Sequence, residues 1–213
     1  ARLLDAGTSD EGARYLVLEY VDGVTLNEYC GSRSLGIEAT LALFCQAVDA
    51  VAYSHAQLIL HRDIKPGNML VTAAGELKLL DFGLGKLLHD DEPLVVAADV
   101  TRMLGIGYTP RYASPEQMRG DGMTTASDVY SLGVTLYEIL TGAAFDGSQH
   151  YTRPSERLAE SATRSTWSRH VRGDIDSIIA RAVSDAPEYR YANAAALGDV
   201  RGGRVPCPPR TRH

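Results

Sequence analysis

The sequence predicts an α+β fold that is mostly helical. Apolar residues recur at intervals of three and four through residues 37–58, which is the pattern of an amphipathic helix. The run "TTASDVYSLGVTLYEILTG", residues 124–142, is apolar on nearly every side, as expected of a helix inside the core. Short strand-forming runs near the N-terminus and around residues 68–82 supply the β part. A chain of 213 residues is long enough to bury one core.

The first half of the chain is expected to alternate short strands with one long helix. Residues 1–21 contain two strand-forming runs, "ARLLDAG" and "RYLVLEYV", joined by the polar turn "TSDEGA". After the helix over 37–58, "NMLV" and "ELKLLDF" form a second hairpin-like pair around "TAAG". Residues 86–123 show weak periodicity and several turn formers, so they are expected to form a long ordered loop, a feature that is usually functional in compact domains.

The second half is expected to be helical. The apolar helix over 124–142 ends at Gly142, and "GDIDSIIARAVSDAP" and "NAAALGDVRG" predict two shorter helices. The last residues, 204–213, are rich in Pro and Arg and are expected to form a disordered tail.

Composition excludes several classes of function. The net charge is −6 and the pI is about 5.5, so the chain lacks the basic surface of a nucleic-acid-binding protein. No apolar run approaches the roughly 18 residues of a transmembrane helix, and no signal peptide is visible at the start. The expected location is therefore cytoplasmic.

The run "HRDIKPGNML", residues 61–70, carries the residues with the clearest chemistry. Asp63 can accept a proton from an attacking hydroxyl, Lys65 can approach a phosphate, and Asn68 offers a neutral oxygen to a metal ion. In "DFG", Asp81 adds a charged oxygen suited to Mg²⁺. Phosphoryl transfer depends mostly on positioning and charge neutralisation, so these parts fit the transfer of a phosphoryl group to a hydroxyl.

These motifs resemble those of eukaryotic-like protein kinases. HRDIKPGN, DFG and "SPE" occur in the family's order, and "KPGN", "TPRYASPEQ" and "DVYSLGVTLYEILTG" are similar to the bacterial serine/threonine branch. The resemblance covers about residues 1–203. It implies that residues 1–22 form the end of the N-lobe and the hinge, and that residues 23–203 form the C-lobe. It also implies ATP and Mg²⁺ as cofactors and a protein with a Ser or Thr acceptor as substrate.

The resemblance assigns roles at the nucleotide site. On the phosphate side, Asp63 is expected to be the catalytic base, Lys65 the stabilising cation, and Asn68 and Asp81 the Mg²⁺ ligands. On the adenine side, the expected residues are the gatekeeper Leu18, the hinge residues Glu19 and Val21, and Leu70 beneath the base.

The resemblance also assigns Thr109 to the catalytic group and gives structural contacts to Glu116, Asp128 and Arg190. Thr109 is expected to contact both Asp63 and Lys65, in the segment that binds the residue after the phosphoacceptor. Glu116 is expected to pair with Arg190. Asp128 is expected to hold the backbone of the catalytic loop, and a helix-capping role remains an alternative because it follows Thr125 by three residues.

Four further side chains, Arg62, Thr101, His55 and His61, can be interpreted in more than one way. Arg62 occupies the position that receives an activation-segment phosphate in such kinases, and Thr101 is the candidate phosphosite. Alternatively, Thr101 is a plain polar loop residue. His55 lies on the apolar helix face and is expected to be a core histidine, and His61 is expected to pack rather than act as a base.

The sequence departs from the family pattern in two places. The glycine-rich loop, the strand lysine and its partner glutamate are absent, because the only lysines are Lys65, Lys78 and Lys86, in or beside the other motifs. This chain alone is therefore expected to be a truncated domain with weak or no activity. The run over 141–161, where the family has a substrate-docking helix, is short and polar. The alternatives are a non-catalytic pseudokinase-like binding module and a small-molecule phosphotransferase.

Overall fold

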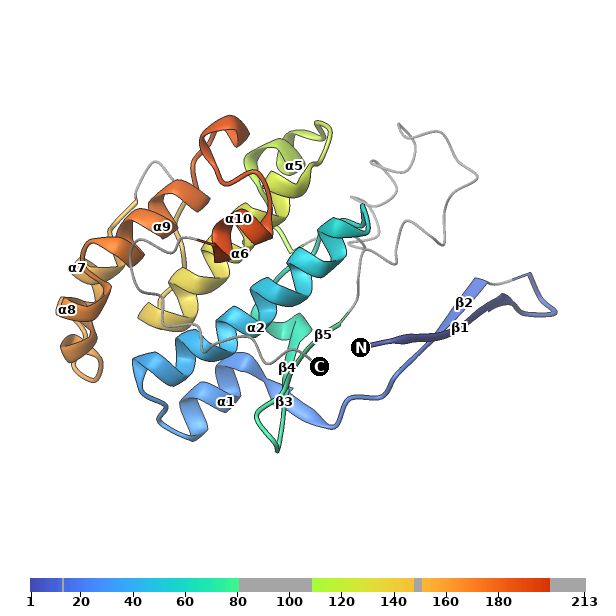
Figure 1. The fold of residues 1–213 in the computed structure, drawn as a ribbon, viewed down its shortest axis with the longest axis horizontal. Helices are drawn as coiled ribbons and strands as arrows, with labels where there is room; N and C mark the ends of the chain where they lie inside the picture. Colours follow the sequence, from blue (N-terminus) through green and yellow to red (C-terminus); the bar gives the residue numbers. More distant parts are fainter. Residues whose placement is uncertain (13, 81–108, 148–150, 200–213) are drawn as a thin grey trace.

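The protein has a helical body from which a β-hairpin projects (Figure 1). The computed structural model describes residues 1–12, 14–80, 109–147 and 151–199. The body contains a small three-stranded sheet and helices that pack around one long buried helix.

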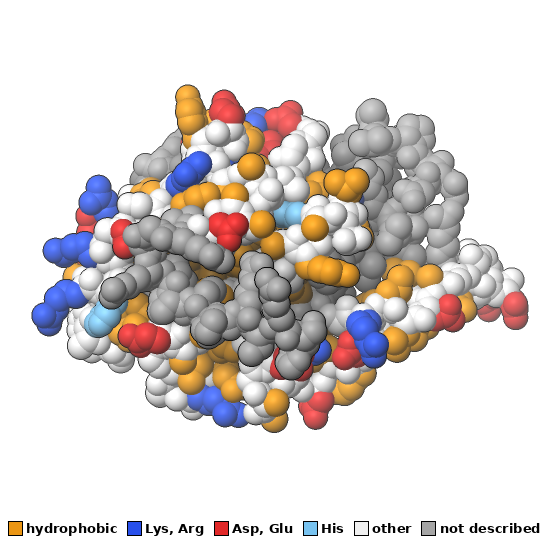
Figure 2. Space-filling view, viewed as in Figure 1, with side chains coloured by type: hydrophobic (Ala, Val, Ile, Leu, Met, Phe, Trp, Pro, Cys, Tyr) orange, Lys and Arg blue, Asp and Glu red, His pale blue; other side chains and the backbone are white. Residues whose placement is uncertain are grey.

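The projecting hairpin consists of β1 (Leu3–Thr8) and β2 (Arg14–Leu18), paired antiparallel with Ala6 opposite Leu16. The two predicted N-terminal strands are thus confirmed. Several of its apolar side chains face solvent, and Figure 2 shows hydrophobic atoms along its length. They are Leu3, Leu4, Tyr15 and Val17, each between 41% and 59% exposed.

The three-stranded sheet has the order β3-β4-β5, with all neighbours antiparallel. Its strands are β3 (Gly23–Thr25), β4 (Met69–Thr72) and β5 (Leu77–Leu79). The sequence predicted the β4–β5 pair but not β3, which is too short to show alternation. A Cβ at Gly23 would lie 2.8 Å from the Val71 carbonyl oxygen, so only glycine lets the strands approach this closely.

Two helices follow β3 and precede the site. Helix α1 (Leu26–Ser32) begins with a capping box in which Thr25 accepts from the Glu28 backbone and Glu28 accepts from the Thr25 backbone. Helix α2 (Ile37–Ala56) is the long amphipathic helix predicted over 37–58.

Helix α6 (Thr125–Thr141) is the centre of the body, and every residue from Ala126 to Leu140 is buried, as its apolar sequence predicted. It ends at Gly142 in the left-handed conformation, with φ of 70°. Helix α9 (Asp174–Ala182) crosses it closely, since a Cβ at Gly133 would lie 2.8 Å from the Ala182 Cβ.

Four shorter helices lie within the described residues: α5 (Pro115–Arg119), α7 (Pro154–Ala159), α8 (Ser168–Val171) and α10 (Ala194–Gly198). Single turns of 3₁₀-helix lie at Pro66–Asn68, Ser165–Trp167 and Pro187–Tyr189. Helices α9 and α10 confirm the two shorter helices predicted near the end.

Two expectations are corrected by these helices. The segment 86–123 was expected to be loop throughout, but α5 lies inside it, started by the Ser114 cap and Pro115. The run 141–161 was expected to be polar without a helix, but α7 forms there and buries Leu158 completely. Both helices are too short to show helical periodicity. Within the described residues, none of the helices has the length and apolar character needed to span a bilayer.

Candidate active site

The catalytic-loop sequence folds back on itself around Asp63. The Lys65 Nζ lies 2.7 Å from the Asp63 Oδ2. The Asn68 side-chain amide donates to the same Oδ2 at 3.0 Å and to the Asp63 carbonyl at 2.8 Å. Both charged side chains stay partly accessible, with 23% of Asp63 and 27% of Lys65 exposed. The loop therefore presents an acid and a cation side by side to solvent.

Local sequence explains this arrangement. Lys65 is extended, with φ of −161° and ψ of 160°, and Pro66 then starts a 3₁₀ turn that carries Asn68 back toward Asp63. Ile64, between the two charged residues, is fully buried. Since successive side chains of an extended segment point to opposite sides, burying Ile64 turns Asp63 and Lys65 outward together.

Thr109 connects a distant segment to this loop. Its backbone N–H donates to the Asp63 Oδ1 at 3.1 Å, and its hydroxyl donates to the same oxygen at 3.4 Å. The hydroxyl also accepts from the Lys65 Nζ at 2.7 Å. Thr109 is therefore beside both residues, where the family resemblance puts it.

Asp128, on α6, fixes the backbone that leads into the loop. Its Oδ2 accepts from the His61 N–H and its Oδ1 accepts from the Arg62 N–H, both at 2.8 Å. The side chain is 1% exposed, so these bonds form in a low-dielectric setting. The alternative capping role is wrong, because the cap of α6 is Thr124, whose capping-box partner is Ser127.

The two histidines near the loop are structural. The His55 Nδ1 accepts from the Ala194 N–H at 3.2 Å, so its Nε2 carries the proton that faces the Asp128 Oδ2 at 2.9 Å. His61 is fully buried, with Nε2 2.8 Å from the Leu80 carbonyl. Burial lowers the pKa of His61, which favours the neutral ring. Both residues match the packing roles expected from the sequence.

Glu116 and Arg190 form a buried ion pair below the segment that carries Thr109. Burial alone would raise the pKa of Glu116, but hydrogen bonds from Arg190 and Ser127 outweigh it and hold the pKa at about 2. The Arg190 Nε and Nη2 also donate to the carbonyls of Ser184 and Asp185. The pair thus ties α5 to the segment before α10.

Arg62 adopts a backbone conformation that is uncommon for an L-residue, with φ of 70°. Its carbonyl accepts from the Gln117 side-chain amide at 3.0 Å. Its Nε is buried and has no hydrogen-bond partner among the described residues. Thr101 and Asp81 lie outside the described residues, so their predicted roles stay predictions.

The residues assigned to adenine lie on different elements. Leu18 ends β2, Glu19 and Val21 follow it, and Leu70 lies in β4; all four are half-buried. The Glu19 carboxylate accepts from the Arg2 N–H at 3.1 Å, and this bond lowers its pKa. Since β2 and β4 belong to separate sheets, the shared role of these residues in adenine binding stays a prediction.

The donor set suits Mg²⁺. Among the described residues, no group of three or more His, Cys, Asp or Glu side chains is placed to bind a metal. Mg²⁺ commonly takes only one or two carboxylates from a protein, together with phosphate oxygens and waters. The Asn68 amide nitrogen makes both hydrogen bonds to Asp63, which leaves its Oδ1 as an oxygen ligand at the site. Asn68 therefore offers one oxygen of the kind that Mg²⁺ takes, and the roles of Asn68 and Asp81 as its ligands stay predictions.

Sequence reasoning missed one charged cluster near the site. Glu138, on α6, is 6% exposed and accepts from the Arg111 Nε at 2.5 Å and the Tyr112 hydroxyl at 2.7 Å. The signal that could have pointed to it is a second carboxylate, Glu138, in the apolar run that also holds Asp128, because a buried charge needs partners.

Comparison with known proteins agrees with this geometry. A family model described as "Protein kinase domain" matches residues 2–198. The serine/threonine-protein kinase PknB of Mycobacterium tuberculosis (strain H37Rv) is 34% identical over 204 residues, which cover 92% of this chain and 32% of that protein. PrkC of Bacillus subtilis (strain 168) is 35% identical over 195 residues, which cover 90% of this chain and 29% of that protein.

A solved structure shows the same fold. The crystal structure of Rad53 1-466 in complex with AMP-PNP matches with a TM-score of 0.61 and 25% identity, over 93% of this chain and 48% of that one. The chain spans about a third of the length of the curated relatives it matches. On the family match and these identities, this chain belongs to the protein kinase domain family.

Proposed function

We propose that this chain is the substrate-side part of an ATP-dependent protein kinase that phosphorylates Ser or Thr hydroxyls. The observation that carries the proposal is the contact of Asp63, Lys65, Asn68 and Thr109 at one partly exposed loop. In this proposal the catalytic loop supplies a base, a cation and a metal ligand, which are groups that phosphoryl transfer requires.

Each residue has a distinct task in this proposal. The Asp63 carboxylate orients the acceptor hydroxyl and takes its proton, while Lys65 neutralises charge on the transferring group. Asn68, together with Asp81, would hold Mg²⁺, which neutralises the phosphates when bound. Thr109 keeps Asp63 and Lys65 in register through its hydroxyl, which bonds to both.

We also assign residues 1–22 to the end of the N-lobe and the hinge, and residues 23–203 to the C-lobe. The supporting feature is the projecting β1–β2 hairpin (Figure 1), which ends at Leu18, just before Glu19 and Val21 in the sequence. Leu18, Glu19, Val21 and Leu70 would then contact the adenine of ATP.

Residues 1–213 alone are expected to catalyse slowly. Their lysines are Lys65, in the catalytic loop, and Lys78 and Lys86, which flank DFG in the sequence, so none is expected to take the role of the strand lysine that contacts the α- and β-phosphates. Losing one electrostatic donor of this type costs about 3–4 kcal/mol in other enzymes, so two such losses imply a rate loss of about 10⁴-fold or more.

The test compares the complete protein with its Asp63→Asn variant in a γ-phosphoryl transfer assay on a generic Ser/Thr acceptor. Loss of a general base is expected to reduce transfer by about 10²–10⁴-fold. Asp121→Asn is the matched control, because Asp121 pairs with Arg119 on the surface of α5's C-terminal turn. Equal activity of Asp63→Asn and the unchanged protein would refute the proposal. Peptide binding without any transfer would favour the pseudokinase-like alternative.

A further inference from the structure

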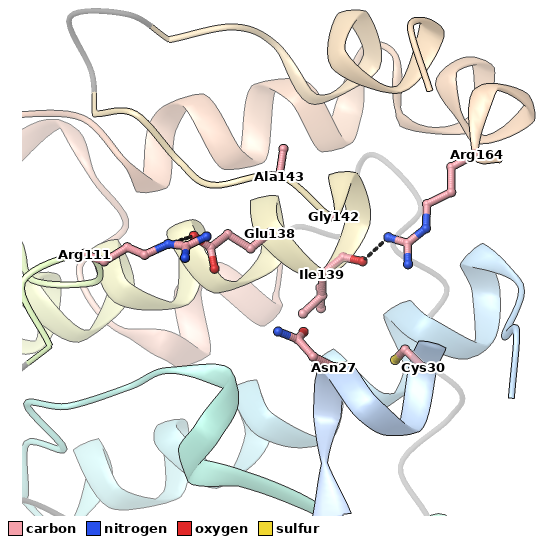
Figure 3. Close-up of a pocket in the computed structure, with 8 residues that line it drawn as sticks. All are labelled: Asn27, Cys30, Arg111, Glu138, Ile139, Gly142, Ala143 and Arg164. Atoms are coloured by element: carbon pink, nitrogen blue, oxygen red, sulfur yellow. Dashed lines mark hydrogen bonds and ion pairs between the residues drawn. The ribbon is translucent and has the colours of Figure 1, made fainter. Parts of the chain in front are cut away.

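A pocket of about 230 Å³ lies between α1 and the C-terminal half of α6 (Figure 3). Asn27 and Cys30 line it from α1, and Glu138 lines it from α6. Arg111 and Arg164 line it from opposite sides; the Arg111 guanidinium lies beside the Glu138 carboxylate, and the Arg164 guanidinium lies beside the Ile139 carbonyl. We call it the Arg111 pocket.

The carboxylate in the Arg111 pocket is fully engaged by the protein itself. Glu138 accepts from the Arg111 Nε, the Tyr112 hydroxyl and the Phe145 N–H, the last at 3.3 Å. A carboxylate with three donors inside the protein has little capacity left for a cation from outside. Glu138 therefore does not make this pocket a receptor for a basic side chain.

The two arginines, in contrast, carry more positive charge than the single carboxylate of Glu138 can neutralise. Arg164 donates from Nη1 to the carbonyls of Ile139 and Leu140, both at 2.9 Å, which are uncharged acceptors. Arg111 contacts Glu138 through Nε, and 47% of its side chain is exposed. With two guanidinium groups and one carboxylate, the lining carries a net positive charge. Arginine presents five N–H donors, and Arg111 uses one of them on Glu138.

The pocket is close to the proposed reaction centre. Thr109, whose N–H and hydroxyl contact Asp63, lies two residues before Arg111. Two residues of chain span at most about 7–8 Å between Cα atoms. A peptide that places its hydroxyl at Asp63 therefore has neighbouring side chains within reach of the Arg111 guanidinium.

We propose that the Arg111 pocket selects peptide substrates with an Asp or Glu side chain near the phosphoacceptor. This inference rests on the proposed kinase function and narrows its substrate class. The peptide carboxylate pairs with the free N–H groups of Arg111, and the field of Arg164 adds to the attraction. A Lys or Arg at the same peptide position meets two like charges and is disfavoured.

The test uses the complete protein and a set of peptides with one Thr acceptor, in which a single Glu, Gln or Lys occupies each of the three positions on either side. Both phosphorylation, as kcat/KM, and peptide binding, by fluorescence anisotropy, are measured. At one position Glu is expected to exceed Gln by about fivefold, the scale of a partly exposed ion pair, and Lys to fall below Gln. Arg111→Glu should reverse the order of Glu and Lys. Arg111→Lys should retain part of the preference.

Two controls separate charge recognition from damage to the fold. Arg119→Gln removes an arginine from the neighbouring α5, where it pairs with Asp121, and should leave the preference unchanged. In the unchanged protein, the preference for Glu should shrink as salt is raised from about 0.05 M to about 0.5 M, because screening weakens partly exposed pairs. The salt series needs no variant, so it tests charge recognition even if an Arg111 variant fails to fold. A preference that does not change with salt would overturn the inference.

The outcomes also separate this inference from the proposed function. Transfer to all peptides with no difference between Glu and Gln at any position would overturn the inference and leave the kinase function standing. Arg111-dependent binding of Glu peptides without transfer to any peptide would support the pocket and overturn the kinase function.

Discussion

Arg190 and Glu116 form a two-pronged ion pair, with Nη1 2.7 Å from Oε1 and Nη2 2.8 Å from Oε2. The residues are 74 positions apart, and neither is more than 4% exposed. The Ser127 hydroxyl donates to the Oε1 as well, at 2.7 Å. The pair therefore joins α5, α6 and the segment before α10 through hydrogen bonds that water does not reach.

Removing one partner of this pair is expected to be strongly destabilising. Arg190→Met leaves the Glu116 carboxylate buried without its cation, and such a change costs about 3–5 kcal/mol in the free energy of unfolding. Urea unfolding followed by circular dichroism measures the loss. Arg153→Met, on an exposed arginine before α7, is the control and should cost less than about 0.5 kcal/mol. Equal effects from the two substitutions would contradict the prediction.

The same pair is expected to shape stability in acid. The pKa of Glu116 is about 2 in the folded chain against an ordinary value of 4.5, so the unfolded chain binds its proton more readily. The stabilisation is fully present above about pH 4.5 and is lost as the pH falls from there toward 2. Unfolding free energies between pH 7 and pH 2.5 should fall more steeply for the unchanged chain than for Glu116→Gln. Parallel curves would count against this assignment.

Asp128→Asn is expected to loosen the catalytic loop. Both carboxylate oxygens accept backbone N–H groups, from His61 and Arg62, whereas an asparagine side chain has a single accepting oxygen. One buried N–H then faces another donor, which should cost about 3 kcal/mol of stability. Hydrogen exchange at the amides of residues 61 and 62 should accelerate, and Asp121→Asn should leave it unchanged. Unaltered exchange in Asp128→Asn would mean that the loop is held by other contacts.

Gly133→Val is expected to separate α6 from α9. A Cβ at Gly133 would lie 2.8 Å from the Ala182 Cβ and 2.9 Å from the Val183 Cγ1, so any side chain forces the helices apart. Overpacking of this kind costs about 1–3 kcal/mol. Gly31→Ala, inside α1 with nothing within 4 Å of its added Cβ, is the matched control. It should stabilise by about 0.5–1 kcal/mol, because alanine favours helix over glycine. Thermal unfolding should show a lower midpoint temperature for Gly133→Val and a higher one for Gly31→Ala than for the unchanged chain.

Thr109→Val is expected to impair catalysis more than folding. Valine keeps the shape but removes the hydroxyl that accepts from Lys65 and donates to Asp63, so both groups lose a fixed neighbour. In the complete protein kcat should fall by about tenfold, the effect of roughly 1.4 kcal/mol of lost positioning. Thr109→Ser retains the hydroxyl and should recover most of the rate. A serine variant as slow as the valine variant would rule out the hydroxyl as the cause.

The sequence predicted long elements well and short ones poorly, for a physical reason. Two helices were predictable because their apolar patterns, over 37–58 and 124–142, each cover several turns. Over that length the local sequence alone indicates which side chains are buried. Helices α5 and α7 have five and six residues, which is too few for a periodic signal. Helix α1 did have one local signal, the Thr25 and Glu28 capping box, although its seven residues show no clear period.

The contacts in the site also fall into two groups, those that the local sequence predicts and those that it does not. Asp63, Lys65 and Asn68 share one short run, so their proximity follows from the chain itself. The contacts of Thr109 with Asp63 and of Arg190 with Glu116 were expected only through the family resemblance, because no local pattern reaches across 46 or 74 residues. The pairing of Arg111 with Glu138 was not foreseen, since it depends on how the segment after Thr109 lies over α6.

The backbone conformation of Arg62 lowers the stability of the catalytic loop, so selection for stability can act on this position. Holding an arginine at φ of 70° costs on the order of 1–2 kcal/mol, and its buried Nε finds no hydrogen-bond partner in the part of the chain that the structure describes. Glycine at this position would remove both the cost of the positive φ and the buried Nε. A laboratory selection for heat resistance alone should therefore replace Arg62 with glycine early, and the survivors would be sturdier proteins that had lost whatever task keeps an arginine there.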